Sequence, residues 1–343
     1  MPRQPSLKDI AKATGFSRPT VSRALNGQSC ISEATKVKIR QVADQIGYRT
    51  DPVKSNLMRS YRGGSNQSAA TVIAWFNEYP EKDYWRKTLF RKNFYEGALS
   101  QAEAHNLRIE PFWYKELGMT GTRLKQILVN RGIHGIIFPT PRYPVNEYGI
   151  DWTKFAVSFI GARPDAAGFS QILPDYFTNM EILLDELSKR GHRRIGLVLS
   201  KHLDWETERR VQARYALRDK SLRPKERVPI LWEKKTGDLS LNFVKWVKRH
   251  QPECLIANRG ETTQWLSEAG FSIPRDISLA SFNVTEHTSS WAGIRINQRQ
   301  MGALAVNSIV QDLGQLHFGP NKQVARLMIP GRWQEGETVR NLA

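Results

Sequence analysis

Three short runs decide the fold at the start of this chain: Ser6-Leu7-Lys8-Asp9-Ile10-Ala11, Gly15-Phe16-Ser17 and Thr20-Val21-Ser22-Arg23-Ala24-Leu25-Asn26. The first run predicts a helix capped by Ser6, because its apolar residues recur at helical spacing. Gly15 predicts a tight turn, and Ser17 predicts the N-cap of a second helix. Ser32 then predicts the start of a third helix. The pattern is typical of a helix-turn-helix, which places its second helix in the major groove of DNA.

The polar residues of the second predicted helix suit contact with DNA. Ser17 and Thr20 lie at its N-terminus, where hydroxyl and backbone N–H groups bind phosphate. Arg18 and Arg23 project from the same helix and can reach base edges.

These runs resemble the headpiece of the lac-repressor (LacI/GalR) family in order and spacing. That family carries a Leu-x-Asp-Val-Ala start, a Gly-Val-Ser turn, a Thr-Val-Ser-Arg-x-Leu-Asn recognition helix and a Gly-Tyr ending, here Gly47-Tyr48. The resemblance implies base reading by Arg18, Pro19 and Arg23. Pro19 departs from the family pattern, because proline offers no side-chain hydrogen bond. The operator is therefore expected to differ from that of family members with a polar residue at this position. The other DNA-binding residues that we predict are Ser6, Ser17, Thr20, Ser22, Asn26, Tyr48, Lys54 and Leu57.

A hinge helix is predicted at about 51–59, because Asp51-Pro52 is a good N-cap and N1 pair. In the family this helix enters the minor groove, and Leu57 matches the leucine that wedges between base pairs there. The alternative is a solvated linker in which Leu57 is incidental.

Charge supports a polyanionic partner for the N-terminal region. The chain has a formal net charge of +18, and residues 1–62 hold twelve lysines and arginines against four acidic residues. Binding is therefore expected to weaken as salt rises. The two cysteines, Cys30 and Cys254, make neither a disulfide framework nor a metal motif. With no apolar leader or membrane-length segment, we predict a cytoplasmic protein without membrane contact.

Residues 1–62 are therefore interpreted as a DNA-binding headpiece with its hinge, followed by a Gly/Ser-rich linker near 62–68. Beyond the linker, apolar runs alternate with helical patterns, which indicates parallel sheets buried on both faces. Strands are predicted at 71–76, 109–114, 135–138, 155–160, 195–199, 254–257 and 277–282. Helices are predicted at 94–105, 122–130, 179–189, 207–220, 239–249 and 262–269.

The family resemblance continues through this region. Gly191-His192-Arg193-Arg194-Ile195-Gly196 and the run from Gly270 to Ser278 match family elements that lead into strands of the second lobe. The predicted fold is thus an all-α headpiece plus an α/β periplasmic-binding-protein-like domain (63–343) with two doubly wound parallel-sheet lobes. The first lobe is predicted at about 69–161 and 291–320, and the second at about 162–290 and 321–343.

The effector site is predicted between the lobes, at strand ends. The resemblance points to Asn258 and to Asn283, which stands where the family usually has Asp, and to Arg210, with Arg209 and Arg214 as rivals. Further candidates are Asn77, Trp85 and Asp175. Trp85 is more typical of a packing residue than of a ligand-binding one, and Asp175 either caps a helix or faces the cleft. Arg210 and Arg259 suit an acidic or phosphorylated sugar, unless Arg259 points to solvent.

No nucleotide, zinc or hydrolase motif is present, so we predict neither an enzyme nor a cofactor or metal. The predicted headpiece contradicts the interpretation of the chain as a pure binding protein. The sequence predicts a transcriptional regulator, a repressor, that binds a near-palindromic double-stranded DNA operator as a homodimer under control of a small-molecule effector, a carbohydrate. The alternative is an effector-independent DNA-binding or architectural protein whose large domain only dimerises.

Overall fold

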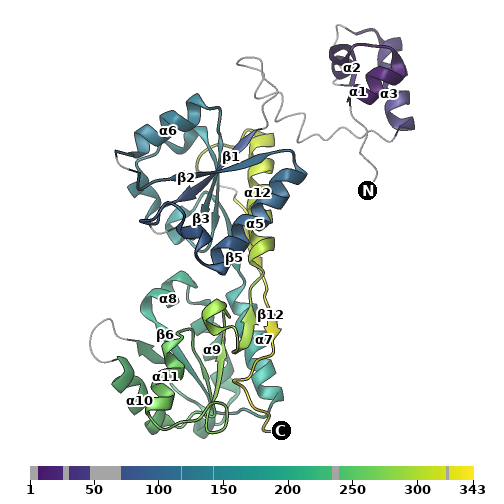
Figure 1. Cartoon of the computed structure of the whole chain (residues 1–343). Coiled ribbons are helices and arrows are strands. Elements are labelled where there is room, and N and C mark those ends of the chain that lie inside the picture. The colour runs from purple at the N-terminus through teal and green to yellow at the C-terminus, as the bar shows by residue number, and fades with distance from the viewer. Residues whose placement is uncertain are drawn as a thin grey trace. The chain divides into compact units, whose positions relative to one another are not determined.

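The computed structural model describes residues 7–25, 31–46, 71–116, 118–141, 143–233, 239–321 and 324–343. The chain divides into two compact units, residues 1–67 and 68–343. The first unit consists of short helices, and the second contains two sheets with helices on their faces (Figure 1). The predicted hinge helix and linker lie outside the described residues.

Three helices form the N-terminal unit, as predicted: α1 (Leu7–Thr14), α2 (Arg18–Leu25) and α3 (Glu33–Gln45). Gly15 has a φ of 75°, and its N–H donates to the carbonyl oxygen of Ala11 at 3.0 Å, which ends α1. The three helices bury one small core, made of Ile10, Val21, Ala24, Ile39 and Ala43. The predicted helix-turn-helix with a supporting third helix is confirmed.

The first sheet of the larger unit has six strands in the order β11-β5-β4-β3-β1-β2, and all neighbours pair in parallel. Its strands are β1 (Val72–Asn77), β2 (Arg108–Trp113), β3 (Gly135–Pro139), β4 (Ala156–Ile160), β5 (Ser170–Pro174) and β11 (Arg326–Ile329). Every residue of β3, β4 and β5 is buried, as expected for parallel strands covered by helices on both faces.

The second sheet has the order β12-β10-β9-β8-β6-β7, with β10 and β12 antiparallel and the other neighbours parallel. Its strands are β6 (Ile195–Ser200), β7 (Leu231–Glu233), β8 (Cys254–Ile256), β9 (Ser278–Ser281), β10 (Ala292–Arg295) and β12 (Arg332–Gln334). Two doubly wound lobes dominated by parallel strands are thus confirmed.

Helices cover the sheets of the larger unit. They are α5 (Leu89–Ala104), α6 (Gly121–Asn130), α7 (Tyr176–Lys189), α8 (Lys201–Glu206), α9 (Arg210–Ser221), α10 (Leu239–His250), α11 (Glu261–Glu268) and α12 (Gln298–Gln315). Short 3-10 turns lie at Tyr84–Arg86, Val145–Tyr148, Trp152–Lys154, Pro164–Ala166, Pro224–Glu226 and Glu286–Thr288. The helix predicted at 207–220 begins only at Arg210. Glu208 and Arg209 have φ values of 51° and 61°, which are not helical, and they form the turn between α8 and α9.

Two of these helices cross at bare backbone. A Cβ atom placed on Gly302 of α12 would overlap the carbonyl oxygen of Phe94 in α5, and one on Gly97 would overlap that of Arg299. Glycine at both positions therefore allows α5 and α12 to touch backbone to backbone.

Sheet membership shifts the predicted lobe boundaries. The first lobe extends through β5, so the chain passes to the second lobe near 175 rather than 161. The chain returns to the first lobe after β10, whereas the prediction placed this return before β10. The strand β11 belongs to the first sheet, although its residues were predicted in the second lobe. The chain therefore changes lobe three times, near 175, 296 and 330, because distant segments complete each sheet. Within the described part of the chain, no helix has the length and apolar character needed to cross a membrane.

Candidate functional sites

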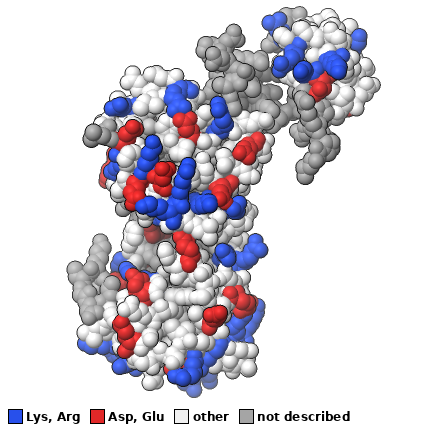
Figure 2. Space-filling model, viewed as in Figure 1, with Lys and Arg blue, Asp and Glu red and all other residues white. Residues whose placement is uncertain are grey.

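The outward side of α2 is polar and basic. Ser17, Arg18, Pro19 and Arg23 are exposed, while Val21 and Ala24 are buried in the core of the unit. Neither arginine has a carboxylate partner among the described residues, so both remain available to a ligand. Among the charged side chains on the visible face of this unit, most are Lys and Arg (Figure 2).

The N-terminus of α2 is shaped by two hydroxyl groups. The backbone N–H of Thr20 donates to Ser17 Oγ at 3.3 Å, and the two side-chain hydroxyls lie 2.8 Å apart. Thr20 and Ser22 are half-buried at the edge of the polar face. The arrangement presents hydroxyl and N–H groups at a helix N-terminus, which is a favourable site for phosphate. The predicted positions Ser6, Asn26, Tyr48, Lys54 and Leu57 lie outside the described residues.

A second polar group lies at the carboxyl edge of the second sheet. Ser281, fully buried at the end of β9, donates its hydroxyl to Asn258 Oδ1 at 2.7 Å and accepts from the backbone N–H of Asn283 at 3.1 Å. The structure thus brings the predicted residues Asn258 and Asn283 together. Asn283 Oδ1 is buried and has no hydrogen-bond partner among the described residues. A buried acceptor of this kind calls for a ligand or water donor.

Asp204 is a candidate that the sequence reasoning missed. It lies on α8, which follows β6 at the same edge of the sheet, and its Oδ1 is buried without a described partner. Burial raises the pKa of this carboxyl above its ordinary value, against the opposing effect of Arg209 and Lys201. Its only sequence signal is an acidic residue shortly after a strand end.

Arg210 is committed to a local ion pair. Its guanidinium lies 3.2 Å from Glu208 Oε2, and Glu208 also accepts from Arg326 on β11 of the first lobe. The rival Arg214 pairs with Glu181 at 3.4 Å. Glu208 therefore joins the two lobes, a role that its position in the sequence did not predict.

Three predicted ligand residues have structural roles instead. Asn77 is buried and donates to the carbonyl oxygens of Glu81 and Lys82, which closes the turn after β1. Trp85 is 5% exposed and packs on Tyr95 with ring centroids 4.1 Å apart. Asp175 caps α7 through the N–H of Thr178 at 3.1 Å. For Trp85 and Asp175 these are the alternatives of packing and capping given above, whereas the turn contacts of Asn77 were not predicted.

An aromatic stack lies at the carboxyl edge of the first sheet. The rings of Tyr79 and Tyr84 stack with centroids 4.4 Å apart, and the Arg91 guanidinium lies 4.7 Å from the Tyr79 ring. The Tyr79 hydroxyl also lies 3.2 Å from the hydroxyl of Thr140, which follows β3. The predicted candidate Trp85 is not part of this stack and packs on Tyr95 instead.

The two lobes touch across the space between these edges. The backbone N–H of Phe90 donates to Glu286 Oε2 at 3.3 Å, and the Arg163 guanidinium lies 5.9 Å from the Trp205 ring. Together with the bond between Glu208 and Arg326, these contacts hold the lobes in the arrangement described.

The described residues contain no group of three or more His, Cys, Asp or Glu side chains that could hold a metal ion. Cys254 is buried, and burial raises the pKa of its thiol, so the sulfur is a packing group rather than a reactive thiolate.

Comparison with known families covers both units. Residues 6–51 match the bacterial regulatory proteins of the lacI family, and residues 184–339 match a periplasmic binding protein-like domain. The chain is 36% identical over 98 residues to the sucrose operon repressor of Vibrio alginolyticus, a match covering 29% of this chain and 85% of that protein.

Longer matches are more distant. The chain is 28% identical over 205 residues to the HTH-type transcriptional regulator TreR of Salmonella typhimurium, which is 60% of this chain and 60% of the length of that relative. The crystal structure of the lac repressor dimer bound to operator and the anti-inducer ONPF superposes with a TM-score of 0.57 at 16% identity, covering 98% of this chain and 100% of that one. At that identity the likeness concerns the fold.

Proposed function

Because the chain belongs to the lacI family of bacterial regulatory proteins, we propose that it is a sequence-specific DNA-binding transcriptional regulator, a repressor controlled by a small-molecule effector. The observation that carries this proposal is the exposed basic side of α2, whose arginines have no carboxylate partner in the described part of the N-terminal unit. Since DNA is its partner, we place the protein in the cytoplasm.

In this proposal α2 enters the major groove of the operator. Arg18 and Arg23 read base edges, because a guanidinium can donate two parallel hydrogen bonds to guanine. Ser17, Thr20 and the helix N-terminus hold phosphate and fix the register. Two N-terminal units in a homodimer would read the two halves of a near-palindromic site, since the symmetry of protein and site must agree.

The proposed effector is a carbohydrate bound at the carboxyl edge of the second sheet. The support is the group formed by Asn258, Ser281 and Asn283, in which one buried amide oxygen has no described donor. A sugar hydroxyl can donate to that oxygen and accept from the amide nitrogen beside it. Asp204 is a second acceptor on the same edge. An acidic or phosphorylated sugar has weaker support, because Arg210 pairs with Glu208, and Arg259 pairs with Glu233 at 3.0 Å.

Control of DNA binding would use the contacts between the lobes. An effector bound between the lobes shifts the equilibrium between two lobe arrangements only if it binds one arrangement more tightly than the other. The described interactions that such a change would break or make include the bond between Glu208 and Arg326, the bond from Phe90 to Glu286 and the contact between Arg163 and Trp205.

Replacing Arg23 by alanine tests the base-reading role. We expect Arg23→Ala to weaken operator binding by roughly 1–3 kcal/mol per site and to relax specificity at one position of each half-site, because a bidentate base contact is lost. Selection of bound sequences followed by fluorescence anisotropy measures both effects. Lys8→Ala, at an exposed lysine of α1, is the control and should weaken all sequences alike. Equal loss on operator and random DNA for Arg23→Ala would contradict the assignment.

Replacing Asn283 by alanine tests the effector site. In a thermal-shift screen of neutral and acidic sugars, a ligand at a hundredfold excess over its Kd should stabilise the protein by about 2.7 kcal/mol. Asn283→Ala should weaken that ligand by about tenfold or more, because the sugar hydroxyl loses its acceptor. Asn130→Ala, at an exposed position at the end of α6, is the matched control. An unchanged affinity in Asn283→Ala would place the site elsewhere, and a screen without any ligand would favour the effector-independent alternative.

A further inference from the structure

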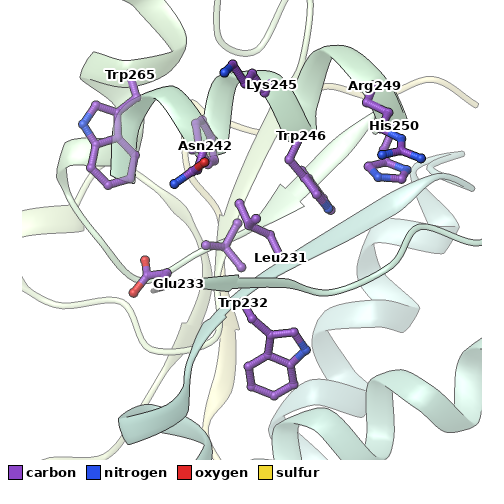
Figure 3. Close-up of a pocket in the computed structure, with 11 residues that line it drawn as sticks. Leu231, Trp232, Glu233, Asn242, Lys245, Trp246, Arg249, His250 and Trp265 are labelled. Carbon is purple, nitrogen blue, oxygen red and sulfur yellow. The ribbon is translucent and has the colours of Figure 1, made fainter. Parts of the chain in front are cut away.

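A separate cavity of about 280 Å³ opens in the second lobe, between the edge strand β7 and the helices α10 and α11 (Figure 3). None of the predicted effector residues lines it, and neither Ser281 nor Asp204 does. An apolar cavity of about 150 Å³ is enough to bind benzene, so this one has room for a molecule of one or two rings.

The walls of this cavity are aromatic and aliphatic. Trp246 and Asn242 point from α10 toward Leu231, and Trp265 approaches from α11 on the other side (Figure 3). Val198 and Phe243 complete the apolar lining, and the rings of Phe243 and Trp265 lie 5.5 Å apart. Both indoles are only half-buried, so each keeps surface that a planar ligand could cover.

The indole of Trp246 is held in place by a glycine. A Cβ atom on Gly196 of β6 would lie 2.6 Å from the Trp246 ring, so the ring rests directly on bare strand backbone. The centroids of the Trp246 and His250 rings lie 5.3 Å apart. The aromatic wall is therefore positioned by packing before any ligand arrives, which lowers the entropic cost of binding.

The rim of the cavity is positively charged. Lys245 and Arg249 are exposed, lie four residues apart on α10, and have no carboxylate partner among the described residues. The one acidic lining residue, Glu233, already pairs with Arg259 at 3.0 Å. Burial and the neighbouring Arg249 and Arg194 lower the pKa of His250, which therefore adds no charge at neutral pH.

We propose that this cavity is a binding site for a small planar aromatic acid. The ring would lie between Trp246 and Trp265 over Leu231, where offset and edge contacts with indole are favourable. The carboxylate would bind the Arg249 guanidinium and the Lys245 ammonium, since a charge-assisted pair at the mouth of an apolar cavity is partly desolvated. The site is independent of the proposed effector site and of DNA binding.

Calorimetry on the full-length protein tests this site, with 1-naphthoate as the anionic probe and 1-naphthamide as its uncharged match. We expect saturable binding of one naphthoate per chain, about tenfold tighter than the amide, because only the acid pairs with the rim cations. The double variant Lys245→Ala/Arg249→Ala should remove that tenfold difference. Lys248→Ala, on the same helix but outside the lining, should leave it unchanged.

A second variant protects the test against effects of charge removal alone. Asn242→Trp places a bulky side chain at the exposed rim and should abolish binding of acid and amide alike, with the melting temperature as the check on folding. The proposal is overturned if wild-type protein binds no naphthoate, if the amide binds as tightly as the acid, or if both variants bind like the wild type.

Discussion

Raising the salt concentration from 50 to 200 mM is expected to lower the affinity of this protein for its proposed operator by roughly a thousandfold. The physical reason is counterion release: each phosphate that a lysine or arginine neutralises frees condensed cations, and salt opposes that release. Residues 1–62 of each chain carry twelve basic side chains against four acidic ones, so the proposed dimer can readily engage about six phosphates or more.

The measurement is a series of anisotropy titrations, with the logarithm of the association constant plotted against the logarithm of salt concentration. Lys8→Ala or Lys12→Ala should each flatten the slope by about two for a dimer, because each removes one phosphate contact per chain. Lys220→Ala, an exposed lysine of α9, should leave the slope unchanged. A wild-type slope shallower than about −2 would contradict the electrostatic account.

Replacing Gly302 by alanine is expected to lower the free energy of unfolding by about 3 kcal/mol. The added Cβ would overlap the carbonyl oxygen of Phe94 and lie 2.9 Å from the backbone nitrogen of Ala98. Because the obstacles are backbone atoms of α5, no side-chain rotation relieves the overlap, and the two helices must move apart. That movement exposes apolar surface beneath both helices, such as Ala98 and Ile309.

Chemical denaturation followed by circular dichroism measures this loss. Gly260→Ala is the matched control, because a Cβ there would meet nothing within 4 Å and its φ of −59° suits any residue. That variant should gain about 0.4–1 kcal/mol through the reduced entropy of the unfolded chain. Equal stability of the Gly302 and Gly260 variants would show that the backbone contact between α5 and α12 is not tight.

Local sequence patterns predicted the helices and strands that are specified by neighbouring residues in the chain. The three helices of the N-terminal unit begin directly after the predicted caps Ser6, Ser17 and Ser32, and strands such as β1 and β4 lie within one residue of their predicted ranges. The pattern did not predict β5, β11 or β12. The strand β5 is a five-residue run ending in Pro174, and its partner β11 lies about 150 residues further along the chain. Such pairing depends on tertiary contacts that no window of sequence contains.

The same limit applies to the sites. Asn258 and Asn283 were predicted from the family resemblance, and the structure joins them through Ser281, whose role depends on the spacing of two neighbouring strands. The sequence positions of Trp85 and Asn77 also suggest ligand binding. In the structure, however, Trp85 packs on Tyr95, and Asn77 donates a hydrogen bond within a turn. The sequence pattern does not mark Asp204 or Glu208 as site residues. Asp204 is distinguished by the burial of its carboxylate, and Glu208 by its bond to Arg326 of the other lobe.

The triple passage of the chain between the lobes restricts how this protein can be cut or rearranged. Since β11 and α12 complete the first lobe and β12 completes the second, no single break in the gene yields a fragment that holds all strands of one lobe and none of the other. A stop codon placed anywhere before residue 326 removes an edge strand from both sheets at once. Isolating one lobe for study would require splicing distant coding segments with a designed linker. Any fusion partner is therefore better attached at a terminus than between the lobes.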